Sequence, residues 1–519
     1  MTRIYTLLPF ARSLCVSARR PAPFFAACLV VLATGCGRES SPDAEAGQDL
    51  SEQAVQAPVP FEAPRNCLFI ILDATAAGHV SLYGYERETT PFIDSLGKDG
   101  VYLSEMYSQA TETPPSVWSY FTGRRPYRPT RKPKVIGVRE TDHVIAETFR
   151  DAGFATGAFS ENIFVTEKMG YGKGFDTFTF VHHREAVPGE KIKYARDDAP
   201  SKELVAKTID WLDANKDGRW FCYVHLLRPH NPYAAQASVA EAFVNVDLPE
   251  GADKFQYVRV REQQVLLNST FKEVDANLRY LEPPSDDELK LLIDLYDGNL
   301  AFADALVKEL YSFLETEGLA EDTLVIVASD HGEAFMEHGV LLHASIPYQE
   351  MQHVPFVMNA PEGTGIRSGR VDVAVEMVDL LPTLLELFDL SHAGPVEGRS
   401  FLPLLRGETD THKDYVICDN IRTDSMSFRL HDRKLILRFD EALENVLSYE
   451  VYDLASDPRE LHNLFTEESA IPELLGPALE YARTWKTDDS FSLDMMTQEQ
   501  IEELQALGYL MDIPEKDDK

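Results

Sequence analysis

The stretch Thr323-Leu-Val-Ile-Val-Ala-Ser-Asp-His-Gly-Glu333 decides the fold class that we expect for this chain. It starts with a continuous apolar run, which is typical of a parallel strand buried on both faces by helices. In open α/β sheets, ligands bind just beyond the carboxyl ends of such strands. Asp330 and His331 come at the end of the run, so we expect them at the functional edge of a mostly parallel α/β sheet.

The same arrangement occurs near the start of the chain, where Cys67-Leu-Phe-Ile-Ile-Leu72 ends in Asp73. Two carboxylates and one imidazole, delivered by two strand ends, suit a divalent metal ion. An Asp after a strand is also a common helix cap or turn residue, and this structural alternative stays open for Asp73 taken alone. A third apolar run, Phe221 to Leu227, is expected to form a buried strand that ends close to His230.

Between these strands lies a segment with its own spacing, Thr113-Pro-Pro-Ser-Val-Trp-Ser-Tyr-Phe-Thr-Gly123. It resembles the nucleophile segment of the sulfatase family in the alkaline phosphatase superfamily. That segment runs Cys or Ser, any residue, Pro, Ser and Arg, with Thr-Gly at a fixed distance. Thr113 falls on the nucleophile position, and the matching residues are Pro115, Ser116, Thr122 and Gly123. Further family-like segments follow in the expected order, and the resemblance covers roughly residues 65 to 510.

The resemblance implies a mostly parallel central sheet sandwiched by helices, followed by a small antiparallel C-terminal subdomain. After Gly407 the sequence shifts to short segments between charged turns, which agrees with this division. We expect a catalytic domain over residues 64–407 and a C-terminal subdomain with a terminal helix over 408–519. The expected short strands are Ser427 to Leu430, Lys434 to Arg438 and Glu450 to Leu454, and the terminal helix runs from Thr497 to Gly508.

A long helix is expected from Pro284 onward. Ser285 is placed as its N-cap and Glu288 follows three residues later, which is the capping-box pattern. Apolar residues then recur with helical spacing, so we expect this helix to contribute to the core.

The resemblance also implies the metal site and the nucleophile. Asp73, Asp330 and His331 would hold one divalent ion, with Thr113 as the fourth protein ligand. A bound ion lowers the pKa of a threonine hydroxyl and offsets the charge of a phosphoryl or sulfuryl group. This ligand set resembles that of lipoteichoic acid synthase and related phosphotransferases, so attack by Thr113 would give a covalent ester.

Two further histidines match family positions near the transferred group. His230 lies in Arg228-Pro-His230, and His343 precedes Tyr348 at the distance where the family places a Lys or His. Either histidine could protonate the leaving oxygen.

Several positions depart from the family pattern. Thr113 cannot be converted to formylglycine, and Val117 stands where an Arg normally follows Ser116. Ala74 and Gly78 replace acidic residues that many members carry. We therefore expect one ion and no formylglycine. The ligand types favour Mn, Ca or Mg, with Zn as the alternative.

These observations predict a metal-dependent hydrolase or transferase that acts on an anionic ester, with phosphate esters favoured over sulfate esters. Two alternatives stay open: a sulfuric ester hydrolase that works without formylglycine, and a catalytically inactive relative that binds an envelope component or a glycan. The natural substrate, the choice between hydrolysis and transfer, and the oligomeric state are not predicted.

The N-terminal 35 residues carry four arginines and no acid, and they include an apolar run from Phe24 to Ala33. This run is too short to span a bilayer, which takes roughly 20 residues, and it is typical of a signal peptide. Ala33-Thr-Gly-Cys36 resembles a bacterial lipobox, and ordinary cleavage is the alternative. We expect a signal peptide over 1–35, a lipidated flexible tether over 36–63, and an exported lipoprotein at the periplasmic face of the outer membrane or cell envelope.

The net charge of −36 argues against a partner that is itself polyanionic. We expect no nucleic acid partner, and membrane contact through the lipid anchor. Cys67, Cys222 and Cys418 are too dispersed to suggest a disulfide framework, so we expect them in the core.

Overall fold

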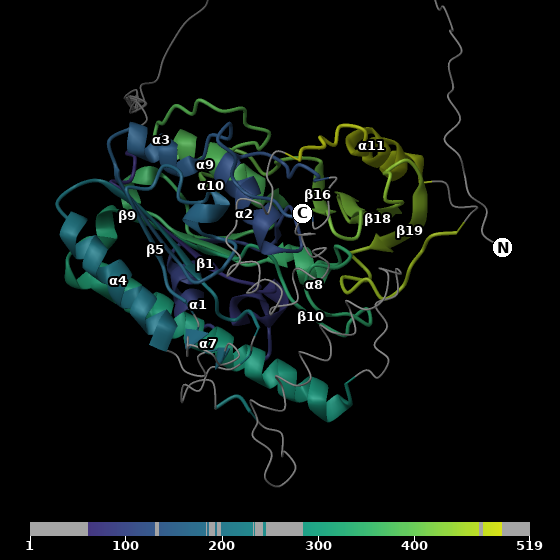
Figure 1. Cartoon of the computed structure of the whole chain (residues 1–519), viewed down its shortest axis with the longest axis horizontal. Coiled ribbons are helices and arrows are strands. Elements are labelled where there is room, and N and C mark those ends of the chain that lie inside the picture. Colours follow the sequence, from purple (N-terminus) through teal and green to yellow (C-terminus); the bar gives the residue numbers. More distant parts are fainter. Residues whose placement is uncertain are drawn as a thin grey trace, which may run out of the picture. The chain divides into compact units, whose positions relative to one another are not determined.

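An eight-stranded sheet forms the centre of the computed structural model (Figure 1). Its strands, in spatial order, are β14 (Gly369–Val371), β2 (Val101–Leu103), β13 (Phe356–Asn359), β9 (Thr323–Ala328), β1 (Asn66–Leu72), β8 (Trp220–Leu226), β4 (Ala155–Ser160) and β5 (Thr177–Phe180). Only β13 runs antiparallel to its neighbours among these strands. The predicted mostly parallel sheet is therefore confirmed.

The structure describes residues 61–129, 134–182, 184–185, 193–194, 199–231, 233, 242–244, 284–466 and 471–489. The predicted signal peptide, nearly all of the predicted tether and the predicted helix from Thr497 to Gly508 lie outside these residues. Among the residues that the structure does describe, no helix combines the length and the hydrophobicity needed to cross a bilayer.

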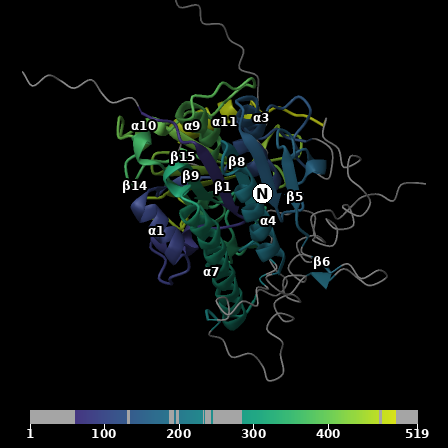
Figure 2. The ribbon, with the colours of Figure 1, turned by 90° about the vertical axis from the view of Figure 1, so that its left-hand side faces the viewer.

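The three apolar runs singled out in the sequence form adjacent central strands. Figure 2 shows β1 lying between β9 and β8. Ile71 of β1 pairs with Ala328 of β9, and Leu72 pairs with Leu226 of β8. The carboxyl ends of the three strands therefore meet at one edge of the sheet.

Helices cover both faces of the sheet (Figure 1). Alternate residues of β1 point to opposite faces, as in any strand. Leu68 and Ile70 pack with α1 (Pro91–Asp99), α4 (Ala199–Asn215) and α7 (Asp286–Thr316). On the other face, Phe69 and Ile71 pack with α2 (Thr113–Thr122), α3 (Ile145–Asp151) and α9 (Leu380–Leu387). The capping box of Ser285 and Glu288 is present at the start of α7, as predicted.

The C-terminal part contains a four-stranded antiparallel sheet, which confirms the predicted subdomain type. Its strands are β16 (Tyr415–Asn420), β17 (Ser425–Leu430), β18 (Arg433–Phe439) and β19 (Val446–Asp453), and α11 (Pro472–Ala482) packs on β17 and β18. Strand β16 is not among the strands predicted from the sequence. The Asp419 N–H donates to the Gln109 carbonyl, which ties this strand to the segment leading into α2.

Smaller elements surround the central sheet. They are β3 (Met106–Tyr107), β12 (His353–Val354), β15 (Val375–Glu376), β6 (Arg184–Glu185), β7 (Lys193–Tyr194), β10 (Ala334–Phe335), β11 (Leu341–Leu342), α8 (Gln349–Gln352) and α10 (Leu402–Leu405). Cys67, Cys222 and Cys418 are buried free thiols, as predicted.

Candidate active site

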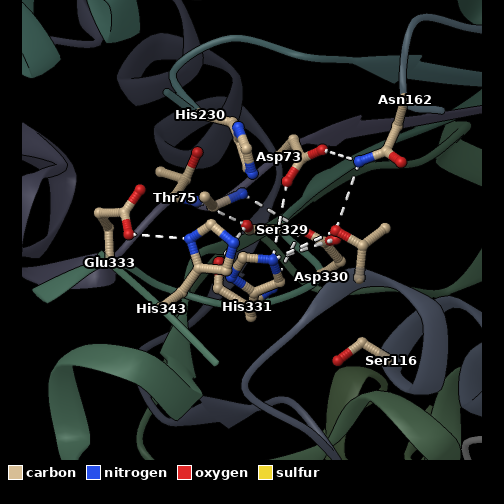
Figure 3. A network of polar contacts seen from close by, with 12 residues as sticks. Asp73, Thr75, Ser116, Asn162, His230, Ser329, Asp330, His331, Glu333 and His343 are labelled. Atoms are coloured by element: carbon tan, nitrogen blue, oxygen red, sulfur yellow. Dashed lines mark hydrogen bonds and ion pairs between the residues drawn. The ribbon is translucent and has the colours of Figure 1, made fainter. Parts of the chain in front are cut away.

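The ends of β1 and β9 bring Asp73, Asp330 and His331 together. All three side chains are fully buried. Backbone hydrogen bonds fix the position of Asp73. Its N–H donates to the Leu226 carbonyl, and its carbonyl accepts from the His230 N–H. The edge predicted from the two apolar runs is therefore where these polar side chains converge (Figure 3).

Each of the two carboxylates has one oxygen held by the protein. Asp73 Oδ2 accepts from Asn162 Nδ2 at 2.5 Å and from His225 Nε2 at 3.1 Å. Neither bond caps a following helix, so the side chain of Asp73 is not the helix cap or turn residue that the sequence left as an alternative. Asp330 Oδ1 accepts from the backbone N–H groups of Ala74 and His331. Asp73 Oδ1 and Asp330 Oδ2 accept no hydrogen bond from any described residue.

His331 is oriented with one ring nitrogen toward these two oxygens. Its Nδ1 donates to the Gly332 carbonyl at 2.8 Å, which leaves Nε2 with a lone pair. That Nε2 lies 3.7 Å from Asp73 Oδ1 and 3.7 Å from Asp330 Oδ2. One possible ligand atom from each of the three residues lies within 4.8 Å of the other two.

Buried carboxylate oxygens without a partner are costly unless a cation binds them. The donor set of two carboxylates and one imidazole therefore fits a divalent metal ion. Burial on its own would raise the pKa of Asp73. The charge of His230 and the hydrogen bond from His225 outweigh burial, so the pKa of Asp73 lies well below its ordinary value. The carboxylate is thus kept in the charged form that a metal ion needs.

Thr113 is the first residue of α2 and is almost completely buried. Prolines follow it at positions 114 and 115, where a helix has no need of their missing N–H groups. Thr113 Oγ1 lies 3.3 Å from His331 Nε2 and 3.4 Å from Asn162 Nδ2. The start of a helix favours negative charge, so this hydroxyl occupies a position suited to an anionic group.

The two predicted histidines lie beside this cluster. The His343 ring centroid is 4.5 Å from that of His331 and 4.7 Å from that of His230. His343 Nδ1 lies 3.0 Å from Glu333 Oε1 (Figure 3). Burial and the neighbouring His331 lower the pKa of His343 to about 3. Burial also lowers the pKa of His230, and it raises the pKa of Glu333 to about 7.

The structure brings together all six site residues that the sequence predicted, namely Asp73, Thr113, His230, Asp330, His331 and His343. It adds three that the sequence analysis did not assign. His225 is a titratable residue inside a buried strand, Asn162 follows the end of β4, and Glu333 closes the quoted motif. A search for polar residues within or just after every buried strand would have found all three.

Two residues that depart from the family pattern, Val117 and Ala74, lie in well-defined surroundings. Val117 is fully buried among apolar residues of α2, so that position brings no charge to the site. Ala74 adopts a left-handed backbone conformation with φ of 58° and directs its N–H at Asp330.

Comparisons with known proteins point to one family. The sulfatase family model matches residues 65–390, and the model described as N-sulphoglucosamine sulphohydrolase, C-terminal, matches residues 337–475. An N-acetylglucosamine-6-O-sulfatase of Bacteroides thetaiotaomicron is 20% identical over 470 residues, which cover 77% of this chain and 82% of that protein. Human arylsulfatase K is 32% identical over 190 residues, which are 34% of each chain.

Solved structures share the fold. A phosphonate monoester hydrolase of Agrobacterium radiobacter matches with a TM-score of 0.62 and 20% identity, over 81% of this chain and 95% of that one. A protein solved with its substrate D-glucosamine-2-N,6-O-disulfate matches with a TM-score of 0.63 and 18% identity, over 82% and 98%. Because the family model spans more than half of the sequence and the matching relatives are hydrolases, this chain belongs to the sulfatase family and is a sulfatase-like hydrolase.

Proposed function

We propose that this chain is a metal-dependent hydrolase or transferase of anionic esters in which Thr113 is the nucleophile. One observation carries the proposal. Asp73 and Asp330 each have one buried carboxylate oxygen that accepts no hydrogen bond from the described residues, and both oxygens lie 3.7 Å from His331 Nε2, which itself contacts the Thr113 hydroxyl. A bound divalent ion would lower the pKa of that hydroxyl and offset negative charge on the substrate. Mn, Ca or Mg suits these ligands, with Zn as the alternative.

The chain's own residues then account for two displacement steps. Thr113 Oγ1 forms a bond to the phosphorus or sulfur of the ester, and the bond from that atom to the leaving oxygen breaks. The proton that the Thr113 hydroxyl loses is balanced by the proton that the leaving oxygen takes up. In the second step, water or an acceptor alcohol forms a bond to the phosphorus or sulfur, and the bond from that atom to Thr113 Oγ1 breaks. The proton lost by the attacking hydroxyl is balanced by the proton that Thr113 regains.

We assign His230 and His343 to contacts with the transferred group and the leaving oxygen of the ester. Their rings lie together on the His331 side of the cluster, and Glu333 holds Nδ1 of His343. His343 therefore presents its Nε2 from a fixed ring orientation. Asn162 lies beside the Thr113 hydroxyl from another strand end, where it can donate to an oxygen of the bound ester.

Phosphate or phosphonate esters are favoured over sulfate esters in this proposal. Thr113 lacks the aldehyde that formylglycine supplies, so a covalent sulfate on Thr113 would need a second direct displacement. The names of similar proteins include both sulfatases and phosphonate monoester hydrolases. A sulfuric ester hydrolase that works without formylglycine is the second candidate.

The test is an assay of the purified protein with added Mn, Ca, Mg or Zn. Paired aryl phosphomonoester, phosphodiester, phosphonate and sulfate substrates are compared, with Thr113→Ala as the control. Turnover of a phosphorus ester that needs metal and is lost in the variant supports the proposal. Sulfate turnover lost in the variant would reverse the substrate ranking. Turnover that survives in Thr113→Ala would exclude Thr113 as the nucleophile.

We further propose that the chain is exported and anchored through lipid on Cys36, as its N-terminal sequence predicts. Incorporation of labelled palmitate into the natural protein but not into Cys36→Ala is the expected result. Equal labelling of both proteins would contradict the proposed anchor.

A further inference from the structure

We infer that His225 is a positioning residue, which fixes the Asp73 carboxylate so that one oxygen faces the metal site. It acts as the middle of a buried hydrogen-bonded chain that starts on helix α2. The inference rests on the proposed metal site, and it concerns residues that would touch neither the ion nor the substrate.

The chain of contacts runs through four fully buried side chains. The hydroxyl oxygens of Tyr120 and Tyr223 are 2.9 Å apart, and the Tyr223 hydroxyl is 2.8 Å from His225 Nδ1. His225 Nε2 is 3.1 Å from Asp73 Oδ2. Every one of these side chains is shielded from solvent, so water does not compete for the bonds.

The chemistry of these groups fixes the direction of each bond. An ionised carboxylate only accepts, so His225 Nε2 must donate to Asp73. In that tautomer Nδ1 accepts, and the Tyr223 hydroxyl donates to it. The Tyr120 hydroxyl then donates to the oxygen of Tyr223. Burial raises the pKa of both tyrosines well above the ordinary value, so both keep the protons that the chain requires.

The chain also joins Asp73 to the helix that carries the nucleophile. Tyr120 comes seven residues after Thr113 on α2, which is about two helical turns and places both on the same helix face. Asn162 supplies a second donor to Asp73 Oδ2 and also lies near the Thr113 hydroxyl. The carboxylate is therefore held from two sides, and Oδ1 is the oxygen left for the ion.

Loss of such outer contacts costs metal proteins roughly 10–100-fold in metal affinity. Without His225, the Asp73 carboxylate keeps only Asn162 as a side-chain donor among the described residues and can rotate away from the ion. The predicted defect is therefore in metal binding, whereas a residue that only fills the core would affect only the stability of the fold.

The experiment uses the full-length protein and Mn²⁺ alone as the probe. The Kd is measured from the electron paramagnetic resonance signal of free Mn²⁺, and the unfolding of the metal-free protein in urea is measured in parallel. His225→Leu is expected to raise the Kd roughly 10–100-fold. His225→Gln retains a donor to Asp73 near the position of Nε2 and loses only the neutral hydrogen bond from Tyr223, so its Kd should stay within about fivefold of the natural value.

Tyr223→Phe removes the donor to Nδ1 without removing the contact to Asp73. We expect a rise in Kd of roughly threefold to tenfold. Tyr83→Phe is the matched control, because the Tyr83 side chain is partly buried and its hydroxyl is hydrogen-bonded, but to the backbone of Leu103 and Phe356. It should weaken the fold to a similar extent and leave the Kd unchanged.

A folded His225→Leu protein that binds Mn²⁺ as tightly as the natural chain would overturn the inference. If that variant does not fold, Tyr223→Phe decides, and a Kd equal to that of Tyr83→Phe would overturn it. Failure of the natural chain to bind any of the four candidate ions would instead remove the proposed metal site, and the positioning role of His225 with it.

Discussion

Thr113 Oγ1 and His331 Nε2 lie 3.3 Å apart, although 218 positions separate these residues in the chain. The first is carried by the start of a helix and the second by the end of a strand, and both supports are buried. Rigid supports of this kind hold reacting groups more accurately than loops do. The hydroxyl is therefore fixed against the cluster of Asp73, Asp330 and His331 before any substrate arrives.

Thr113→Ala should lower kcat by roughly 10³-fold or more, as removal of a nucleophile does in hydrolases that act through a covalent intermediate. Three protein ligands would remain, so the Mn²⁺ affinity should fall by no more than about tenfold. Thr113→Ser keeps the hydroxyl and is the matched control, for which measurable turnover is expected. An active Thr113→Ala protein in steady-state assays would contradict the role.

Asp330→Asn should abolish metal-dependent stabilisation. The amide can still accept at the Oδ1 position from Ala74 and His331, while its NH₂ group cannot serve as a ligand at the position of Oδ2. A ligand present at 100 times its Kd stabilises the native state by about 2.7 kcal/mol. Addition of Mn²⁺ should therefore raise the urea midpoint of the natural protein, and chelation should reverse the rise. An equal rise in Asp330→Asn would mean that the ion binds elsewhere.

Arg422 links the C-terminal sheet to the start of α2, where Thr113 lies. Its Nε donates to Glu112 Oε2 at 2.5 Å, and Glu112 directly precedes Thr113. The turn that carries Arg422 is held by Asn420, whose Nδ2 donates to Thr111 Oγ1 and to the Ser345 carbonyl. The C-terminal sheet therefore supplies a positive charge close to the site. In the family pattern, an Arg stands at the position that Val117 occupies here.

Arg422→Met should leave the buried Glu112 carboxylate uncompensated and raise the KM for an anionic ester roughly tenfold. The double variant Arg422→Met with Glu112→Gln removes both charges and should recover most of the loss. Steady-state kinetics of the two single variants and the double variant measure this coupling. Additive losses in the double variant would show that the pair acts through separate effects.

The ligand cluster could be predicted because its residues end apolar runs in the sequence. Asp73, Asp330 and His331 each interrupt a run that can only be a buried strand, and the meeting of adjacent strand ends follows from the parallel sheet. The prediction of Thr113 as a site residue depended on the spacing of a known family's nucleophile segment. Nothing in its local sequence distinguishes it from an ordinary helix start.

The remaining site residues depend on contacts that the sequence does not encode locally. His225 is indistinguishable from a core histidine until Asp73 is placed beside it. Glu333 meets His343 because β10 and β11 form a hairpin, with Ala334 paired to Leu342, and these strands are too short to predict from alternation. The strand before Asn162 contains Gly157, where the absence of a side chain makes room for Trp211. The apolar pattern of that strand is therefore weak in the sequence.

The contribution of Asp142 to the free energy of unfolding should change in acid. Burial on its own would raise its pKa, but hydrogen bonds from Arg139 and from Trp118 on α2 outweigh burial and lower the pKa below the model-peptide value of 3.8. A carboxyl with a lowered folded pKa contributes stability above its unfolded pKa and loses that contribution as pH falls through the folded value. Asp142→Asn should therefore cost about 2–3 kcal/mol at pH 7.

The cost of Asp142→Asn should shrink below pH about 4, because the carboxyl is then protonated in the unfolded chain before it is protonated in the folded protein. Urea unfolding at pH 7, 5 and 3.5 measures the difference between the two proteins. Asp151→Asn changes the same charge at a largely exposed position and should cost little at any of these values. A cost for Asp142→Asn that is constant over this range would mean that packing beneath α2, and not the charge of Asp142, stabilises the helix that carries Thr113.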